Sequence, residues 1–198
     1  MIRSDLDLDM ELSVRPLTEK DFDAFISYWQ GLSPADVERM GVAIDRMPSP
    51  AKMRVGLQAM LATPADRANS FVLAWCVNGE AIGHSSLKDI VPGDFGSIHL
   101  HMWRADLRGK GYGPRLFCLA VLDFYKRFKL KRMICEPKAD NPAPNRLLRR
   151  IGFPLASTRT GTGSELSAVC QLNRYDIARQ ITQSFLATHR SECSESKK

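Results

Sequence analysis

The amino-acid sequence predicts an α+β fold, and two features of the chain support this prediction. The apolar segment 71–77 is followed by Asn78-Gly79, a dipeptide typical of two-residue β-hairpin turns, and then by a second strand-like segment at 81–87. Further along, a glycine-rich turn joins a strand to an amphipathic helix, and another strand follows that helix. A hairpin sheet followed by a strand–helix–strand unit is typical of the α+β class.

The N-terminal part of the chain is predicted to hold one short strand, Glu11–Val14, and several short helices. Thr18 fits the N-cap of the first helix, because apolar residues follow it at helical spacing: Phe22, Phe25, Ile26 and Trp29. Ser33-Pro34 and Ser49-Pro50 each place a proline directly after a serine that can cap a helix. Two more helices are therefore expected to begin at these positions.

Three strands are predicted in the middle of the chain. Residues 71–77 are apolar and partly β-branched or aromatic, which indicates a buried strand, and Ala81–Leu87 is expected to be its hairpin partner. A loop through Pro92, Gly93 and Gly96 is expected to lead to the third strand, Ser97–Trp103.

The remaining elements follow from periodicity and turn residues. A helix is expected at Pro114–Phe128, where apolar residues form one stripe, and a strand at Arg132–Cys135. A short helix is expected at Asn145–Arg150 and a late strand at Ser167–Leu172, after a turn at Gly161–Gly163. The segment Arg174–Thr188 is predicted to be the closing helix.

The length of 198 residues fits a single domain, expected over residues 1–190, with a polar, disordered tail over 191–198. No segment approaches the roughly 18 apolar residues of a membrane span, and the stretch before Leu12 lacks the basic and apolar regions of an export signal. The five cysteines are scattered and lack metal-ligand spacing. We therefore expect a cytoplasmic protein without a bound metal and without a membrane partner.

The net charge of +6 fits nucleic acid, an acidic partner or a polyanionic cofactor. Nucleic acid is not the expected partner, because the basic clusters lack interleaved aromatic residues and no nucleic-acid-binding motif is present.

The run Arg108-Gly109-Lys110-Gly111-Tyr112-Gly113 carries the clearest functional signal. It lies between the strand that ends at Trp103 and the helix that begins at Pro114. Gly111 and Gly113 remove Cβ atoms, so backbone N–H groups can approach an anion, and the helix dipole favours negative charge there. The run matches neither the dinucleotide-binding fingerprint nor the P-loop. It predicts a phosphate site of another kind.

This run resembles the Gln/Arg-x-x-Gly-x-Gly/Ala motif of the GNAT acyltransferase superfamily. Downstream, the segment from Asn141 to Ile151-Gly152-Phe153 resembles the Asn-rich helix of that superfamily, which ends in Gly-Phe. The order of elements matches from about Leu12 to Asn173, and the resemblance is nearest to the ribosomal-protein-acetyltransferase-like and siderophore-type branches. It implies a mixed, mostly antiparallel central sheet flanked by helices, with a splayed strand pair that holds acyl-CoA.

Acetyl-CoA, or another acyl-CoA, is the cosubstrate that the resemblance implies. Its pyrophosphate would lie on the glycine-rich loop with two basic side chains nearby, and its pantetheine arm would pair with the strand Ile98–Trp103 where this splays from Met133–Glu136. The implied cofactor contacts are Met102, Trp103, Arg108, Gly109, Lys110, Gly111, Tyr112, Gly113, Asn141 and Asn145.

His99 is the first candidate for the general base. His99 and His101 share one face of their strand, because side chains alternate, and the resemblance makes this the substrate-facing side. Siderophore-type members carry a histidine where His99 stands. An imidazole of ordinary pKa, about 6.5, is mostly neutral at pH 7 and can accept a proton. His101 and Glu136 are the alternative bases. A hydrogen-bonded structural role and a His-x-His metal pair are the competing interpretations.

The sequence departs from the family at the group that would protonate the leaving thiolate. Many members carry a Tyr where this chain has Leu148, and the chain also differs from particular branches at Pro144 and Lys138. The remaining candidates are Tyr112, Tyr125 and water. Cys135 lies in an apolar strand, so it is expected in the core rather than as a nucleophile.

The resemblance implies direct attack by a primary amine of a small molecule or of a peptide N-terminus. The helices from Leu17 to Leu61 and the loop from Lys88 to Gly96 are expected to wall the acceptor pocket, with the side chains of Trp29, Met40, Asp45, Met47 and Met53. A catalytically decayed acyl-CoA-binding or interaction module is the alternative, and Leu148 is its main support. A monomer and a homodimer both fit the sequence.

Overall fold

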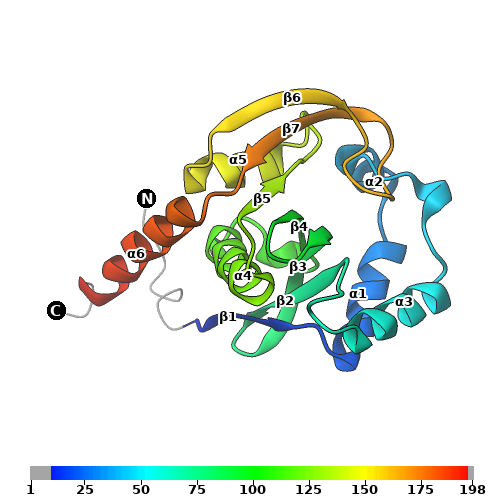
Figure 1. The fold of residues 1–198 in the computed structure, drawn as a ribbon, viewed down its shortest axis with the longest axis horizontal. Coiled ribbons are helices and arrows are strands. Elements are labelled where there is room, and N and C mark those ends of the chain that lie inside the picture. Colours follow the sequence, from blue (N-terminus) through cyan, green and yellow to red (C-terminus); the bar gives the residue numbers. More distant parts are fainter. Residues whose placement is uncertain (1–9, 196–198) are drawn as a thin grey trace.

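Seven strands form one sheet in the computed structural model, which describes residues 10–195 (Figure 1). Their order in the sheet is β1-β2-β3-β4-β5-β7-β6. The β4–β5 pair is parallel and the other pairs are antiparallel. The mixed, mostly antiparallel sheet confirms the predicted fold class. The strands are β1 (Leu12–Pro16), β2 (Phe71–Val77), β3 (Glu80–Val91), β4 (Phe95–Met102), β5 (Arg132–Cys135), β6 (Leu155–Gly161) and β7 (Cys170–Asp176).

The predicted helix starts are confirmed where a serine caps the chain. Ser33 accepts a hydrogen bond from the backbone N–H of Asp36, and Ser49 accepts one from the N–H of Lys52. Thr18 forms a capping box with Asp21 ahead of the first helix. The helices are α1 (Phe22–Gln30), α2 (Pro34–Met40), α3 (Pro50–Ala62), α4 (Tyr112–Phe128), α5 (Pro142–Ile151) and α6 (Arg179–Glu195). Short 3-10 turns lie at Glu19–Asp21, Ile44–Arg46 and Ala105–Leu107.

The β2–β3 hairpin has the predicted turn. Asn78 and Gly79 have φ angles of 50° and 80°, the positive values that a type I′ turn requires at both central residues. The next turn is tighter than expected, because β3 extends to Val91 and β4 already begins at Phe95. Gly96 therefore lies inside β4, where a Cβ would come within 3.1 Å of three side-chain atoms of Leu87.

Several expected boundaries in the second half of the chain are wrong. Strand β6 was not predicted, since its residues are mostly exposed and show no apolar alternation. The expected closing helix at Arg174–Thr188 begins instead at Arg179, because β7 continues to Asp176. Helix α5 begins at Pro142, ahead of the expected Asn145, since Asn141 caps it. Helix α6 includes the first residues of the expected tail 191–198, and residues 196–198 lie outside the described part of the chain.

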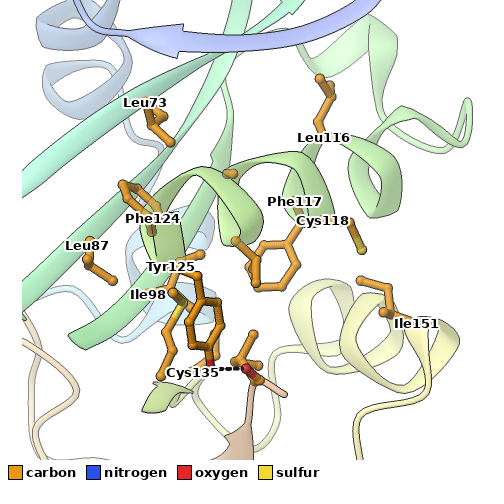
Figure 2. Packing of buried hydrophobic residues seen from close by; sticks show 14 of the residues in the cluster. Leu73, Leu87, Ile98, Leu116, Phe117, Cys118, Phe124, Tyr125, Cys135 and Ile151 are labelled. Atoms are coloured by element: carbon orange, nitrogen blue, oxygen red, sulfur yellow. Dashed lines mark hydrogen bonds between the residues drawn. The ribbon is translucent and has the colours of Figure 1, made fainter. Parts of the chain in front are cut away.

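Helix α4 packs against one face of the sheet and makes the larger core cluster (Figure 2). Leu73, Leu87 and Ile98 contribute from the strands, and Phe117 and Phe124 from the helix. Helices α1 and α3 pack against the opposite face, on the second cluster that includes Val72, Ala74 and Cys76 of β2. Alternate residues of β2 thus contact different layers. None of the helices in the described residues has the length and apolar character needed to cross a bilayer.

Strands β4 and β5 diverge after a short contact. Phe95, Gly96 and Ser97 pair with Arg132, Met133 and Ile134, and the pairing stops there. Beyond this point β4 stays paired with β3, whereas β5 pairs with β7 through Cys135 and Tyr175. The backbone edge of β4 that faces β5 is therefore without a strand partner beyond Ser97 in the described structure. This is the predicted splayed pair.

Candidate active site

A cavity of about 1100 Å³ lies where β4 and β5 diverge. One side of it is formed by the glycine-rich loop and the start of α5, and the other by α1, α2, α3 and the histidine-bearing face of β3 and β4. Pockets that bind drug-sized ligands have volumes of roughly 300–1,000 Å³, so this space can hold a large ligand or two molecules that meet.

The glycine-rich loop faces this cavity with two residues of positive φ. Gly109 has a φ of 79°, and Gly111, the N-cap of α4, has a φ of 89°. A Cβ on either residue would meet no protein atom within 4 Å. Two things would therefore oppose a side chain at these positions: the strain of a positive φ angle, and contact with a ligand bound in the cavity. The arrangement fits a helix N-terminus that binds an anion through backbone N–H groups.

Gly113 lines the cavity as well and has a second, structural role. Its φ is not in the positive range, and a Cβ there would lie 3.1 Å from the Cδ1 atom of Leu147 on α5. Gly113 therefore permits the close packing of α4 against α5. Tyr112, also expected at the cofactor, is the first residue of α4, and its side chain is buried in the larger core cluster.

Basic side chains surround the loop. Arg108 lines the cavity, and its guanidinium donates a hydrogen bond of 3.2 Å to the carbonyl oxygen of Met102, which also lines the cavity. Arg146 and Arg150 of α5 add two more cations to the wall, while Lys110 is exposed on the loop. The indole N–H of Trp103 donates a hydrogen bond to His84, which lies on the other side of the cavity. The Trp103 side chain therefore points away from the glycine-rich loop.

The two asparagines of the Asn-rich segment, Asn141 and Asn145, form hydrogen bonds within the protein. Asn145 is 1% exposed, and its amide donates to the carbonyl oxygens of Lys138 and Asn141 at 2.9 and 2.7 Å. Its carbonyl oxygen accepts from Asn173 and Tyr175, both at 2.9 Å. These bonds use the two N–H groups and both lone pairs of the amide. Asn141 caps α5 and lines the cavity.

Three histidines form one cluster on the face of β3 and β4 that looks into the cavity. The β3–β4 register pairs His84 with His101 and Ser86 with His99, so the expected shared face of His99 and His101 also carries His84. The rings of His84 and His101 stack with centroids 4.8 Å apart. The Nδ1 atom of His84 accepts the indole N–H of Trp103 at 2.7 Å. That nitrogen is therefore unprotonated, because an indole N–H can only donate.

Loss of hydration keeps these histidines neutral, with His84 buried and His99 and His101 half-buried on the cavity wall. Loss of hydration, with a smaller effect of Lys88, lowers the pKa of His99 to about 4. The pKa of His101 falls to about 3, through loss of hydration and the positive potential of His99 and Arg39. His84 is fully buried, and burial holds its pKa well below 6.5. The sequence suggested that His99 has an ordinary imidazole pKa. In the structure His99 is a weaker base, which stays unprotonated at pH 7.

Glu136, the alternative base, is engaged by an arginine of β6. The guanidinium of Arg159 donates to both carboxylate oxygens, at 2.8 and 2.5 Å, and Arg174 lies 3.9 Å away. The hydrogen bonds from Arg159 hold the pKa of Glu136 below its usual range against the opposing effect of burial. A carboxylate so bound is a weak proton acceptor.

Two side chains that the sequence did not single out as catalytic lie in this cavity, His84 and Tyr28. The hydroxyl of Tyr28 lies 3.2 Å from Nδ1 of His101, and burial raises the pKa of this phenol to about 12, so it keeps its proton. Tyr125, one expected proton donor, donates instead to the carbonyl oxygen of Ile177 in the core (Figure 2). Cys135 is buried, and burial raises the pKa of its thiol, as expected for a core residue.

The acceptor side of the cavity has a wall that was not predicted. The β6–β7 turn lies beside α2 (Figure 1), where the N–H of Ala43 donates to Leu166 and the N–H of Ala168 to Gly41. Trp29, Met40 and Met53 line the cavity as expected, whereas Asp45 and Met47 do not. From the expected loop 88–96, residues 88 and 89 reach the cavity. Among the described residues, no His, Cys, Asp and Glu side chains are grouped so that they could hold a metal ion.

Comparisons with known proteins agree with this geometry. A family model described as acetyltransferase (GNAT) domain matches residues 11–154. No curated protein matches the chain in sequence. Among solved structures, an aminoglycoside acetyltransferase, AAC(6')-Ib in complex with coenzyme A, superposes with a TM-score of 0.66 at 18% identity, over 88% of this chain and 98% of that one.

Two further structures are similar. RimL, a ribosomal L7/L12 alpha-N-protein acetyltransferase in complex with coenzyme A, has a TM-score of 0.67 at 17% identity, over 83% of this chain and 92% of that one. The structure of yncA, a putative acetyltransferase from Salmonella typhimurium with acetyl-CoA, has a TM-score of 0.64 at 17% identity, over 85% and 94%. At these identities the similarity shows the shared fold.

Proposed function

The chain belongs to the acetyltransferase (GNAT) domain family, and on this premise we propose that it transfers an acetyl group from acetyl-CoA to a primary amine by direct attack. The observation that supports this most is that one cavity contains both the glycine-rich loop and the histidine cluster, and that it opens where β4 and β5 diverge. A phosphate-bearing donor and an acceptor can therefore meet at the split.

In the proposed complex the pyrophosphate of CoA lies on the N-terminus of α4, with Arg108, Arg146 and Arg150 as cations. The pantetheine arm pairs with the free backbone edge of β4 near Met102. We leave Asn145 out of the proposed contacts, because its hydrogen-bonding groups are already used within the protein.

The reaction then needs one proton acceptor and one proton donor. The amine lone pair attacks the thioester carbon, the C–N bond forms, and the carbonyl electrons move to oxygen, where a backbone N–H stabilises them. His99 takes the proton from the nitrogen, which becomes acidic once it is bonded to carbon. The oxyanion re-forms the carbonyl and expels the CoA thiolate. Tyr28, which keeps its proton, is the proposed donor to that thiolate.

A thiol-release assay with acetyl-CoA and a panel of amines tests this function. His99→Ala should lower turnover about 10²–10⁴-fold with little change in acetyl-CoA affinity. His189→Ala on α6, outside this cavity, is the matched control and should retain wild-type turnover. Glu136→Gln should reduce turnover less than His99→Ala, because Arg159 already binds both carboxylate oxygens of Glu136, whereas Nε2 of His99 has no hydrogen-bond partner among the described residues. Equal activity of His99→Ala and the control would exclude His99 as the base.

The competing proposal is that the protein has lost catalytic activity and acts as an acyl-CoA-binding module. Leu148, where many relatives carry a Tyr, has an aliphatic side chain that cannot donate a proton, and it is fully buried in the core. Binding of acetyl-CoA without thiol release for any amine would favour that module.

A further inference from the structure

The acceptor side of the cavity is a chamber of rings. It is formed by Phe25, Tyr28 and Trp29 of α1, His84 of β3 and His101 of β4, and we call these five residues the ring chamber. The Trp29 and His101 centroids lie 4.7 Å apart, as do those of Phe25 and His84. Apolar side chains of α3, Met53, Leu57 and Met60, continue the wall toward the exterior. These rings pack against one another and form a continuous wall, on which a flat apolar group can stack.

Charges around this chamber do not favour an ammonium ion. The charged side chains that line the cavity on this side are Arg39 of α2, Lys52 of α3, Lys88 and Asp89 of β3, Glu136 after β5, Lys138 before α5 and Glu165 of the β6–β7 turn. Asp89 and Glu165 are exposed, and Glu136 is held by Arg159. Within the described residues, the chamber therefore has no buried carboxylate free to pair with a cation.

The positive side chains act on the chamber itself. Lys88 contributes to the lowered pKa of His84 and Arg39 to that of His101, so their positive potential reaches two rings of the chamber. At His99, which lies outside the chamber, Asp89 and Glu136 oppose the effect of Lys88 on the pKa. The hydroxyl of Tyr28 is also neutral. An amine that entered as an ammonium would lose its hydration beside two cations and without a free carboxylate to pair with, and attraction to the ring faces would offset only part of this cost.

Building on the proposed function, we infer that the acceptor is a weakly basic amine that enters as the free base and carries a ring-sized apolar group into the ring chamber. An α-amino group next to an amide is such an amine, with a pKa of about 7.7–8.0, whereas an alkylamine has a pKa of about 10.4. At pH 7.5 roughly a third of the first and about a thousandth of the second is neutral. Fully burying a large apolar side chain favours binding by about tenfold to a hundredfold.

Three amines, assayed with the wild-type protein, test the need for a weakly basic amine and the need for a ring separately. Phenylalanine amide has the ring and the weakly basic amine, 2-phenylethylamine has the ring alone, and glycine amide has the weakly basic amine alone. At pH 7.5 we expect kcat/KM for phenylalanine amide to exceed that of 2-phenylethylamine about a hundredfold and that of glycine amide at least tenfold. Between pH 7.5 and 8.5 the rate should rise about tenfold for 2-phenylethylamine and about two- to threefold for phenylalanine amide.

A charge variant tests the electrostatic part. Lys88→Glu places a carboxylate at the edge of the chamber, so it should raise kcat/KM for 2-phenylethylamine relative to phenylalanine amide about tenfold. Lys131→Glu, an exposed lysine that does not line the cavity, is the matched control and should leave this ratio unchanged. An unchanged ratio in Lys88→Glu would overturn the inference.

The outcomes distinguish this inference from the proposed function. If glycine amide or the polycation kanamycin is acetylated as fast as phenylalanine amide, the chamber does not select the acceptor and the inference fails, although amine acetylation stands. Equal rates for 2-phenylethylamine and phenylalanine amide at pH 7.5 also overturn it. If acetyl-CoA shifts the melting temperature but none of the amines releases thiol, the proposed function itself fails.

Discussion

Gly111→Ala is the most direct test of the phosphate loop, because the chain supplies a control with the same backbone strain. Gly111 has a φ of 89° and Gly93 has a φ of 81°, and a Cβ on either would meet no protein atom within 4 Å. Gly111 lines the cavity, whereas Gly93 lies in the β3–β4 turn and does not. The two alanine variants should therefore differ only in what the added methyl group does to a ligand.

Both variants should lose a similar amount of stability. Placing a non-glycine residue in the left-handed region costs about 1–2 kcal/mol, and the stiffer unfolded chain offsets about 0.4–1 kcal/mol of this. The net loss of about 1 kcal/mol corresponds to a melting temperature lower by about 2–4 °C in a chain of this length. CoA binding should separate the variants. Losing one backbone hydrogen bond to a charged phosphate costs about 1.5–3 kcal/mol, which weakens Kd about 10- to 150-fold in Gly111→Ala alone.

Calorimetric titration with CoA and thermal unfolding measure these two effects separately. We expect both variants to lose the same amount of stability and only Gly111→Ala to lose affinity for CoA. Should Gly111→Ala and Gly93→Ala bind CoA within threefold of each other, the loop is a structural turn and the pyrophosphate does not lie on it.

Three further predictions concern the cavity. Lowering the pH from 7.5 to 5.5 should reduce the free energy of unfolding by about 1 kcal/mol for each of His84, His99 and His101, because the unfolded chain takes up protons below pH 6.5 that the folded protein excludes; a flat urea-unfolding profile would contradict their lowered pKa values. Asn145→Ala should lower that free energy by about 3 kcal/mol, since its buried partners lose their bonds; urea unfolding measures this. Tyr28→Phe should lower turnover at least tenfold at an unchanged acetyl-CoA Kd; full turnover would exclude Tyr28 as the donor.

Local signals were sufficient for the parts of the fold that depend on neighbouring residues. Ser33 and Ser49 cap helices because the hydroxyl and the N–H it accepts are three residues apart, and the Asn78-Gly79 turn depends on the φ angles of two residues. The glycine-rich loop is equally local. The glycine-rich loop that the sequence singled out lines the cavity.

Contacts between distant residues explain what the sequence did not predict. Strand β6 has no apolar pattern, and its Arg159 acts on Glu136 only because β7 brings the two together. Without this pairing Glu136 looks like an available base. His84 could have been found, because folding the chain about its expected turn at Pro92-Gly93 places His84 opposite His101. The signal was that His84 lies on the same side of this expected hairpin as His101.

The low pKa of His99 changes what a pH–rate profile can report. An ordinary imidazole would impose a limb near pH 6.5, but a base with a pKa of about 4 is already unprotonated throughout the range where the protein works. The burial that weakens this base also keeps it from being protonated. Any rise of turnover between pH 6 and 9 must then come from another group, and the acceptor amine is the one that titrates there. The profile should therefore move with the pKa of the amine supplied, and a limb near pH 6.5 that stays fixed for every amine would contradict the burial of the histidine cluster.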